Sequence, residues 1–121
     1  MTLHGYVEDT PHWLQQIDML ISNSYWEGLP VSLLEAMASG CYCVSHFWDG
    51  AEEILPLDNL YVTDTELQQR IIEYCHRPSE EKYRAQTAMR TLACQKYDIE
   101  KRKKDICRII EEVVACPTGQ V

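Results

Sequence analysis

Two short apolar runs enclose a segment that has a helix-start signal near one end and a helix-stop signal at the other. The runs are residues 19–22 and residues 41–47, and both have the length and apolar character of buried strands. Between them, Pro30 suits the first position of a helix, and Gly40 suits the position just after its end. The segment therefore predicts a strand–helix–strand unit, in which a crossover helix joins two parallel strands.

The remainder of the sequence continues this alternation. We expect further short strands at residues 3–7 and 60–62, a short helix after Pro11, and a helical turn within residues 49–55. The C-terminal half predicts three helices, at residues 65–76, at residues 79–96, and within residues 96–116, where Asp98 is the cap. The predicted fold class is therefore α/β, a Rossmann-like parallel sheet with flanking helices.

The composition of the chain excludes several classes of protein. A length of 121 residues suits one domain, and 45% hydrophobic residues are enough for a packed core. A net charge of −8 argues against a nucleic-acid binder. No apolar stretch approaches a membrane span, and the first residues lack the pattern of a signal peptide. We therefore expect a cytoplasmic protein whose six cysteines are reduced, with at most a peripheral membrane contact.

Charge is distributed unevenly along the chain. Residues 1–69 hold eleven Asp and Glu but no Lys or Arg, and the first cation is Arg70. A site in this part of the chain must meet an anion through backbone N–H groups or through cations from elsewhere. The loop of residues 23–30 is the main candidate for a ligand-binding site, because ligands bind at the carboxyl ends of parallel strands.

The segment from Ser24 to Gly40 combines three features that suit a ligand with hydroxyl groups. Gly28 lets the backbone approach a ligand closely. The helix that Pro30 begins would present free N–H groups at its positive end. Glu27 in the loop and Glu35 in the helix supply carboxylates, which accept strong hydrogen bonds from hydroxyl groups.

With these residues in place, the sequence resembles the C-terminal, donor-binding domain of retaining GT-B glycosyltransferases of group 1. The similarity covers about residues 3–110. It is carried by His4-Gly5-Tyr6-Val7, Ile17-Asp18 through Ser24, the E-x7-E motif of Glu27 and Glu35, and Gly50-Ala51-Glu52-Glu53-Ile54. The motif stands in its usual surroundings of Gly28-Leu29-Pro30 and Ala36-Met37-Ala38.

The resemblance implies a role for each matching residue. Glu27 would contact the donor sugar at the reacting centre, and Glu35 would hold the ribose hydroxyls. The loop after Val7 would contact the base. The sugar and diphosphate would meet backbone and side-chain groups of Ser24, Gly28, Leu29, Val31, Ser32 and Leu33. The donor would be a nucleotide-diphosphate sugar, transferred with retention of configuration, with no other cofactor and no metal in the site.

The resemblance also implies missing parts. In the family an Arg and a Lys upstream of the first residue here grip the diphosphate, and an N-terminal domain binds the acceptor. In the family strand order 3-2-1-4-5-6, this chain would hold strands 3 to 6 and leave a gap in the sheet. Three interpretations follow: a donor-binding part of a longer enzyme, a binding subunit that a separate partner chain completes, or an inactive fragment.

Simpler interpretations apply to several of these residues. Glu27 and Glu35 would also be stable as two solvated acids near a helix start. Ser24 and Ser32 suit helix caps, and Cys41 and Cys43 suit core filling, because no partner at zinc spacing accompanies them. The basic run of residues 101–104 is interleaved with acids and suits a solvated helix face or a weak membrane contact.

Overall fold

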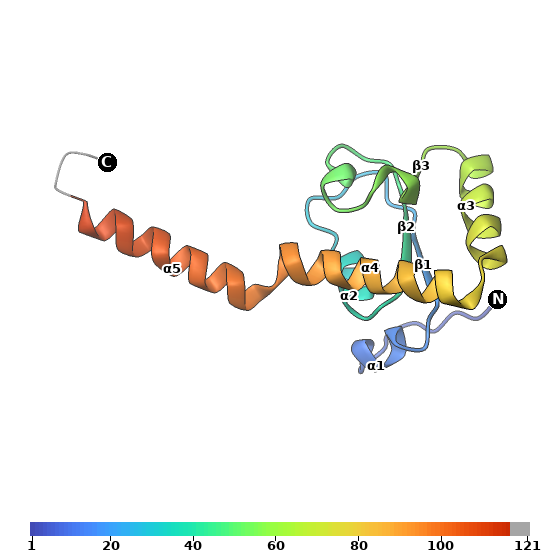
Figure 1. Ribbon diagram of the computed structural model, residues 1–121, viewed down its shortest axis with the longest axis horizontal. Helices are drawn as coiled ribbons and strands as arrows, with labels where there is room; N and C mark the ends of the chain where they lie inside the picture. The colour runs from blue at the N-terminus through green and yellow to red at the C-terminus, as the bar shows by residue number, and fades with distance from the viewer. Residues whose placement is uncertain (117–121) are drawn as a thin grey trace.

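The computed structural model describes residues 1–116 (Figure 1). Within these residues, three strands and five α-helices follow one another with two single 3₁₀ turns. The elements are α1 (Thr10–Leu14), β1 (Met19–Ser22), α2 (Val31–Ala38), β2 (Tyr42–His46), the turns Ala51–Glu53 and Leu57–Asn59, β3 (Leu60–Tyr61), α3 (Asp64–His76), α4 (Ser79–Tyr97) and α5 (Ile99–Ala115). This order confirms the predicted alternation from residue 10 onward.

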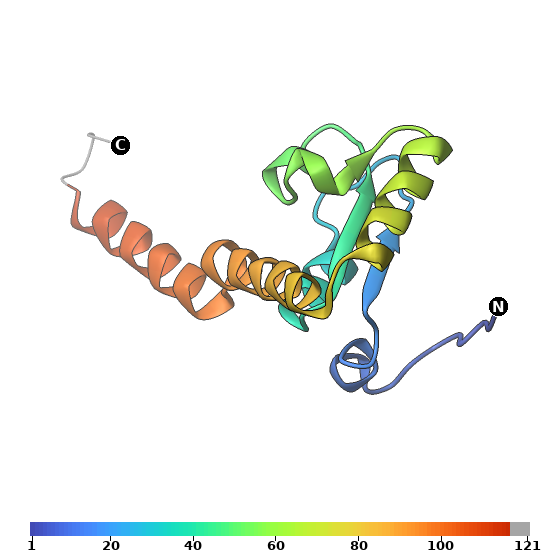
Figure 2. The ribbon, with the colours of Figure 1, turned by 45° about the vertical axis from the view of Figure 1, so that its right-hand side comes forward.

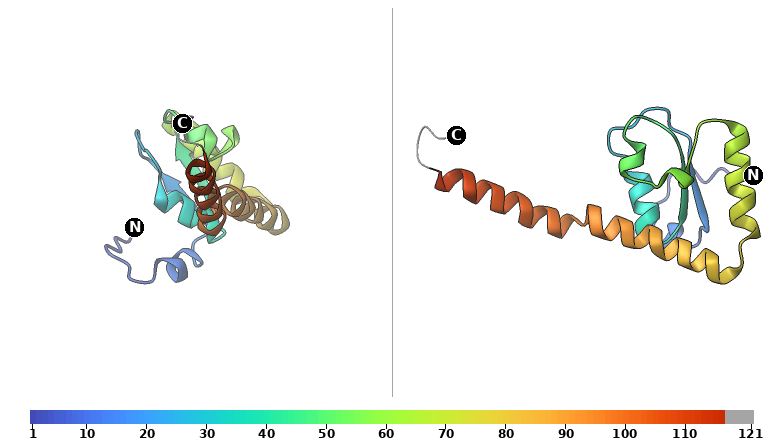
Figure 3. Two further views of the ribbon diagram at one scale, coloured as in Figure 1. Left: turned by 90° about the vertical axis from the view of Figure 1, so that its left-hand side faces the viewer. Right: turned by 45° about the horizontal axis from the view of Figure 1, so that its top comes forward.

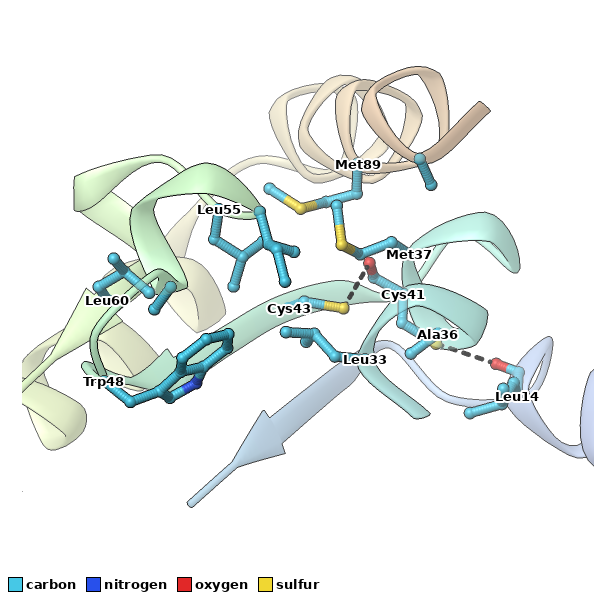
Figure 4. Packing of buried hydrophobic residues seen from close by; sticks show 13 residues of the cluster. Leu14, Leu33, Ala36, Met37, Cys41, Cys43, Trp48, Leu55, Leu60 and Met89 are labelled. Carbon is cyan, nitrogen blue, oxygen red and sulfur yellow. Dashed lines mark hydrogen bonds between the residues drawn. The ribbon is translucent and has the colours of Figure 1, made fainter. Parts of the chain in front are cut away.

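The three strands form one parallel sheet in the order β1-β2-β3. Alternate residues of β2 point to opposite faces, as the period of a strand requires. Cys43 packs with Leu33, Met37 and Met89 in the core that α2 and α4 cover (Figure 4). Tyr42 and Val44 pack on the other face, against Tyr74 of α3. Figure 2 shows α3 beside that face. The predicted α/β fold class is confirmed.

Local signals set the ends of α2. Gly40 has a φ of +89°, which only glycine adopts without strain. The N–H of Gly40 donates to the carbonyl of Met37 at 3.1 Å, and that of Cys41 donates to Ala36 at 3.0 Å. This pair of bonds is a Schellman motif. The chain then turns directly into β2, as the sequence predicted.

The prediction of a strand at residues 3–7 is wrong. These residues form no strand; residues 3–6 are exposed and Val7 is half-buried. A strand is stable only when its backbone groups pair with a neighbour, and the described residues place no strand beside this segment. The sheet of residues 1–116 therefore also lacks the expected gap. The sheet consists of three contiguous strands, and β1 is an edge strand whose Ile21 is 43% exposed.

The last helix has an apolar stripe that nothing in the described chain covers. Figures 1 and 3 both show α5 extending away from the sheet. Its N-cap is Asp98, whose carboxylate accepts from the N–H of Glu100 at 2.9 Å. No residue of α5 is buried, and Ile106, Ile109 and Val113 are exposed.

The basic run at the start of α5 is solvent-exposed and partly paired. Lys103 lies 2.9 Å from Glu100, and Arg102 lies 3.4 Å from Asp105. These exposed pairs contribute little to stability, typically below about 1 kcal/mol each. Among the residues that the structure describes, no helix is both long and apolar enough to cross a membrane.

Candidate functional site

The loop between β1 and α2 lies at the carboxyl edge of the sheet, where the sequence predicted a site. It ends at buried Pro30, the N-cap of α2, whose ring supplies no capping bond. The first intrahelical bond runs from the N–H of Leu34 to the carbonyl of Pro30, at 3.1 Å. The N–H groups of Val31, Ser32 and Leu33 therefore lack an intrahelical acceptor. Neither Ser24 nor Ser32 acts as the side-chain cap of this helix.

Glu27 lines a small hollow beside this helix start. The hollow measures about 220 Å³. Its lining comprises Tyr25, Trp26, Glu27, Gly28, Trp48 and Asp49. Glu27 is half-buried, and no atom lies within 4 Å of the position where Gly28 would carry a Cβ. The open space at Gly28 and the nearby carboxylate leave room for a ligand rich in hydroxyl groups.

Trp48 forms one wall of this hollow, and sequence analysis did not identify it. Only 6% of its surface is exposed, and its indole N–H is buried without an acceptor. The following turn lies close against the ring. Gly50 has a φ of +103°, and a Cβ at that position would lie 3.3 Å from the Trp48 ring. The predicted turn around residues 50–54 therefore supports the wall of the Glu27 hollow.

Glu35 lies in a second, larger hollow of about 420 Å³. The side chain is exposed on α2 and faces the start of α1, where Thr10 and Pro11 also line the hollow. The hydroxyl of Thr10 donates to the carbonyl of half-buried Val7 at 3.4 Å. The structure thus brings Glu35 close to the segment that follows Val7. It does not place Glu35 and Glu27 in one hollow; Glu27 lines a hollow of the β1–α2 loop, and Glu35 lines a hollow on α2.

A cation from a distant part of the chain lines the Glu35 hollow. Arg90 of α4 contributes to its wall. Sequence analysis did not identify Arg90, because nothing in its local pattern distinguishes it from the other basic residues of the helices. In the part of the chain that the structure describes, no salt bridge joins Arg90 or Glu35 to another side chain.

Aromatic side chains fix the base of the β1–α2 loop. The ring of His46, at the end of β2, lies 4.3 Å from the ring of Tyr25 and 5.5 Å from that of Tyr61. The hydroxyl of Tyr61 can donate to Oδ1 of Asn23 at 2.7 Å or to the carbonyl of Ser22 at 3.2 Å. Burial is the main cause of the raised pKa of Tyr61, with smaller contributions from Tyr25 and Asp64.

The two thiols of β2 have a structural role. Cys41 and Cys43 are fully buried and unpaired. Burial raises the pKa of both thiols, with a further contribution from Asp18 at Cys41 and from Cys41 at Cys43. Such thiols stay protonated and unreactive. Core filling is therefore confirmed. The described residues contain no cluster of three or more side chains that could hold a metal ion.

Comparison with known proteins gives one family match. The family model described as "Glycosyl transferases group 1" matches residues 1–77, which is more than half of the chain. This range contains both glutamates of the E-x7-E pattern, the whole lining of the Glu27 hollow and the whole sheet. No solved structure matches the chain. The fold and this match agree, and the chain belongs to the group 1 glycosyltransferases.

Proposed function

We propose that this chain binds a nucleotide-diphosphate sugar and serves the retaining transfer of a hexosyl group to a glycan or lipid-linked acceptor. The observation that carries the proposal is the uncapped first turn of α2, which opens at the carboxyl edge of the sheet beside the Glu27 hollow. Free N–H groups and the positive end of the helix dipole attract phosphate there. Family membership supports glycosyl transfer in general.

Each part of such a donor would have a counterpart in the β1–α2 loop or on α2. The diphosphate would accept hydrogen bonds from the N–H groups of Val31, Ser32 and Leu33, which would offset the charge that develops as it leaves. The sugar would occupy the hollow of Glu27 and Gly28, whose carboxylate accepts from its hydroxyls. The nucleoside would occupy the Glu35 hollow, whose volume suits a group of that size.

We further propose that an acceptor-binding half or a separate partner chain completes the site. Two features of the described chain support this. Residues 1–69 contain no cation to balance a diphosphate. The stripe of Ile106, Ile109 and Val113 is uncovered, as expected of a surface that another domain covers. The protein would work in the cytoplasm, and exposed cations of α5 would allow at most a peripheral membrane contact.

In the described part of the chain, the lining of the Glu27 hollow contains no Lys or Arg, and this favours one alternative function. A chain that binds the donor but cannot stabilise the leaving diphosphate would be a binding subunit without activity of its own. The two functions differ in one respect. The enzyme would transfer sugar when its completing half is present, and transfer would depend on Glu27.

Titration calorimetry on the full chain tests the donor site, with UDP-glucose and GDP-mannose as probes. We expect Glu35→Gln to weaken binding about tenfold, because an ionised acceptor forms the stronger hydrogen bond. Glu27→Gln should weaken binding less and should lower turnover in the completed enzyme. Glu81→Gln, an exposed change at the start of α4, is the matched control. Equal affinity and turnover for all three variants would contradict the assignment.

A further inference from the structure

The Glu35 hollow contains two opposite charges that do not pair with each other. Glu35 and Arg90 both line it, and in the described part of the chain no salt bridge involves either side chain. Both groups are therefore available to a ligand. Besides these charges, Pro11, Leu14 and Ala38 give the hollow apolar walls. Apolar walls with a few polar groups are typical of a site for a small molecule.

The position of the hollow on α2 disfavours a phosphate as the partner of Arg90. The hollow is lined by Ala38 and Ser39, which form the last residue and the C-cap of α2. This end of the helix carries the negative end of the dipole, and Glu35 adds a full negative charge. The free N–H groups that suit phosphate lie at the opposite end, at residues 31–33. Arg90 is therefore placed to meet a neutral acceptor group.

From this arrangement we infer that Arg90 recognises the base of the nucleotide and that the base is guanine. This inference rests on the function proposed above. The guanidinium group presents paired N–H donors in a rigid fork, which matches two adjacent acceptors. Guanine offers such a pair in O6 and N7, whereas adenine offers one acceptor beside a donor. Glu35 accepts from the ribose hydroxyls in the same hollow, and the apolar walls cover the face of the base.

Calorimetric titration of the full chain with GDP, UDP and ADP tests this inference. The wild-type chain should bind GDP at least about fivefold more tightly than UDP or ADP, the discrimination expected of one good bidentate contact. Arg90→Gln should abolish this preference. Arg90→Lys should also abolish it, because lysine keeps the charge but lacks the fork. Arg84→Gln is the matched control, since Arg84 lies on the same helix but pairs with Glu80 at 2.7 Å.

The outcomes separate this inference from the proposed function. Equal binding of GDP and UDP by the wild-type chain would overturn the role of Arg90 and leave the donor site standing. A GDP preference that survives in Arg90→Gln would do the same. Binding of none of the three nucleotides would contradict both. Thermal unfolding of each variant distinguishes recognition of the base from a merely structural role of Arg90. In a structural role, Arg90→Gln would lower the melting temperature and Arg90→Lys would restore it. Neither variant would then change the nucleotide preference, and this result would contradict the inference.

Discussion

The hydroxyl of Tyr61 on β3 lies 2.7 Å from Oδ1 of Asn23, the first residue after β1. The contact crosses over β2, which separates the two strands in the sheet. It therefore ties the last strand to the start of the loop that carries Glu27. Because the Tyr61 ring is also 98% buried, its position is fixed by the core and not by the loop. The candidate site is thus anchored to the interior of the domain.

Replacing this tyrosine should weaken the anchor without disturbing the core. Tyr61→Phe removes the hydroxyl and leaves Asn23 without its partner, which costs about 1 kcal/mol. For a domain of this size, the melting temperature should fall by about 4 °C. Tyr83→Phe, at an exposed position of α4, should leave it unchanged. Differential scanning calorimetry on the two variants measures both values, and an equal melting temperature would show that Tyr61 does not hold the loop.

Two glycines near the Glu27 hollow should respond differently to alanine. Gly50→Ala places a side chain at a φ of +103° and 3.3 Å from the Trp48 ring, so the variant should lose about 1–2 kcal/mol of stability. Gly28→Ala meets no atom within 4 Å and should unfold like the wild type. Its methyl group would instead fill the space proposed for the sugar and weaken donor binding. Urea unfolding combined with donor titration tests both expectations, and the reverse pattern would contradict them.

The buried thiols of β2 predict a loss of stability at alkaline pH. The pKa values of Cys41 and Cys43 are raised above the ordinary value of 9.0, mainly by burial. The unfolded chain therefore releases these protons at a lower pH than the folded chain does. Their contribution to stability is fully present below about pH 9 and is lost as the pH rises above that value.

Urea unfolding at intervals between pH 8 and pH 10 should show this decline under reducing conditions. A variant with Cys41→Val and Cys43→Val should lack the part of the decline that begins near pH 9. A variant with Cys75→Val and Cys94→Val is the control, since both of these thiols are exposed. An identical pH dependence in all three proteins would show that the buried thiols do not cause the decline.

The sequence predicts those features of this structure, such as helix ends, that are determined by residues close together in the chain. Gly40 ends α2 as predicted, whereas Pro30, predicted as the first helical residue, is the N-cap one position earlier. The start of α3 is also determined locally, because Thr63 caps this helix through a capping box with Glu66. Backbone bonds from residues 62 and 63 also lower the pKa of Glu66. In each case the physical cause lies within a few residues of the element it controls. The failure at residues 3–7 has the opposite cause, since a strand requires a partner that local sequence does not contain.

The candidate site could likewise be predicted only where neighbouring residues determine it. The loop, the uncapped helix start and the two glutamates follow from the pattern between residues 22 and 40. Trp48 and Arg90 do not, because tertiary packing brings them to the hollows. Trp48 reaches the Glu27 hollow through a turn after β2, and Arg90 reaches the Glu35 hollow from a helix packed against α2. The separation of the two glutamates into different hollows also depends on this packing.

The central claim is that a nucleotide-diphosphate sugar binds at the start of α2. Its most direct test is a ¹H–¹⁵N NMR titration of the full chain with GDP-mannose and with UDP-glucose. The account predicts that the backbone amide signals of Gly28, Val31, Ser32 and Leu33 shift with added donor, while those of α5 stay in place. Donor-dependent shifts confined to other parts of the chain, or no shift at millimolar donor, would contradict it.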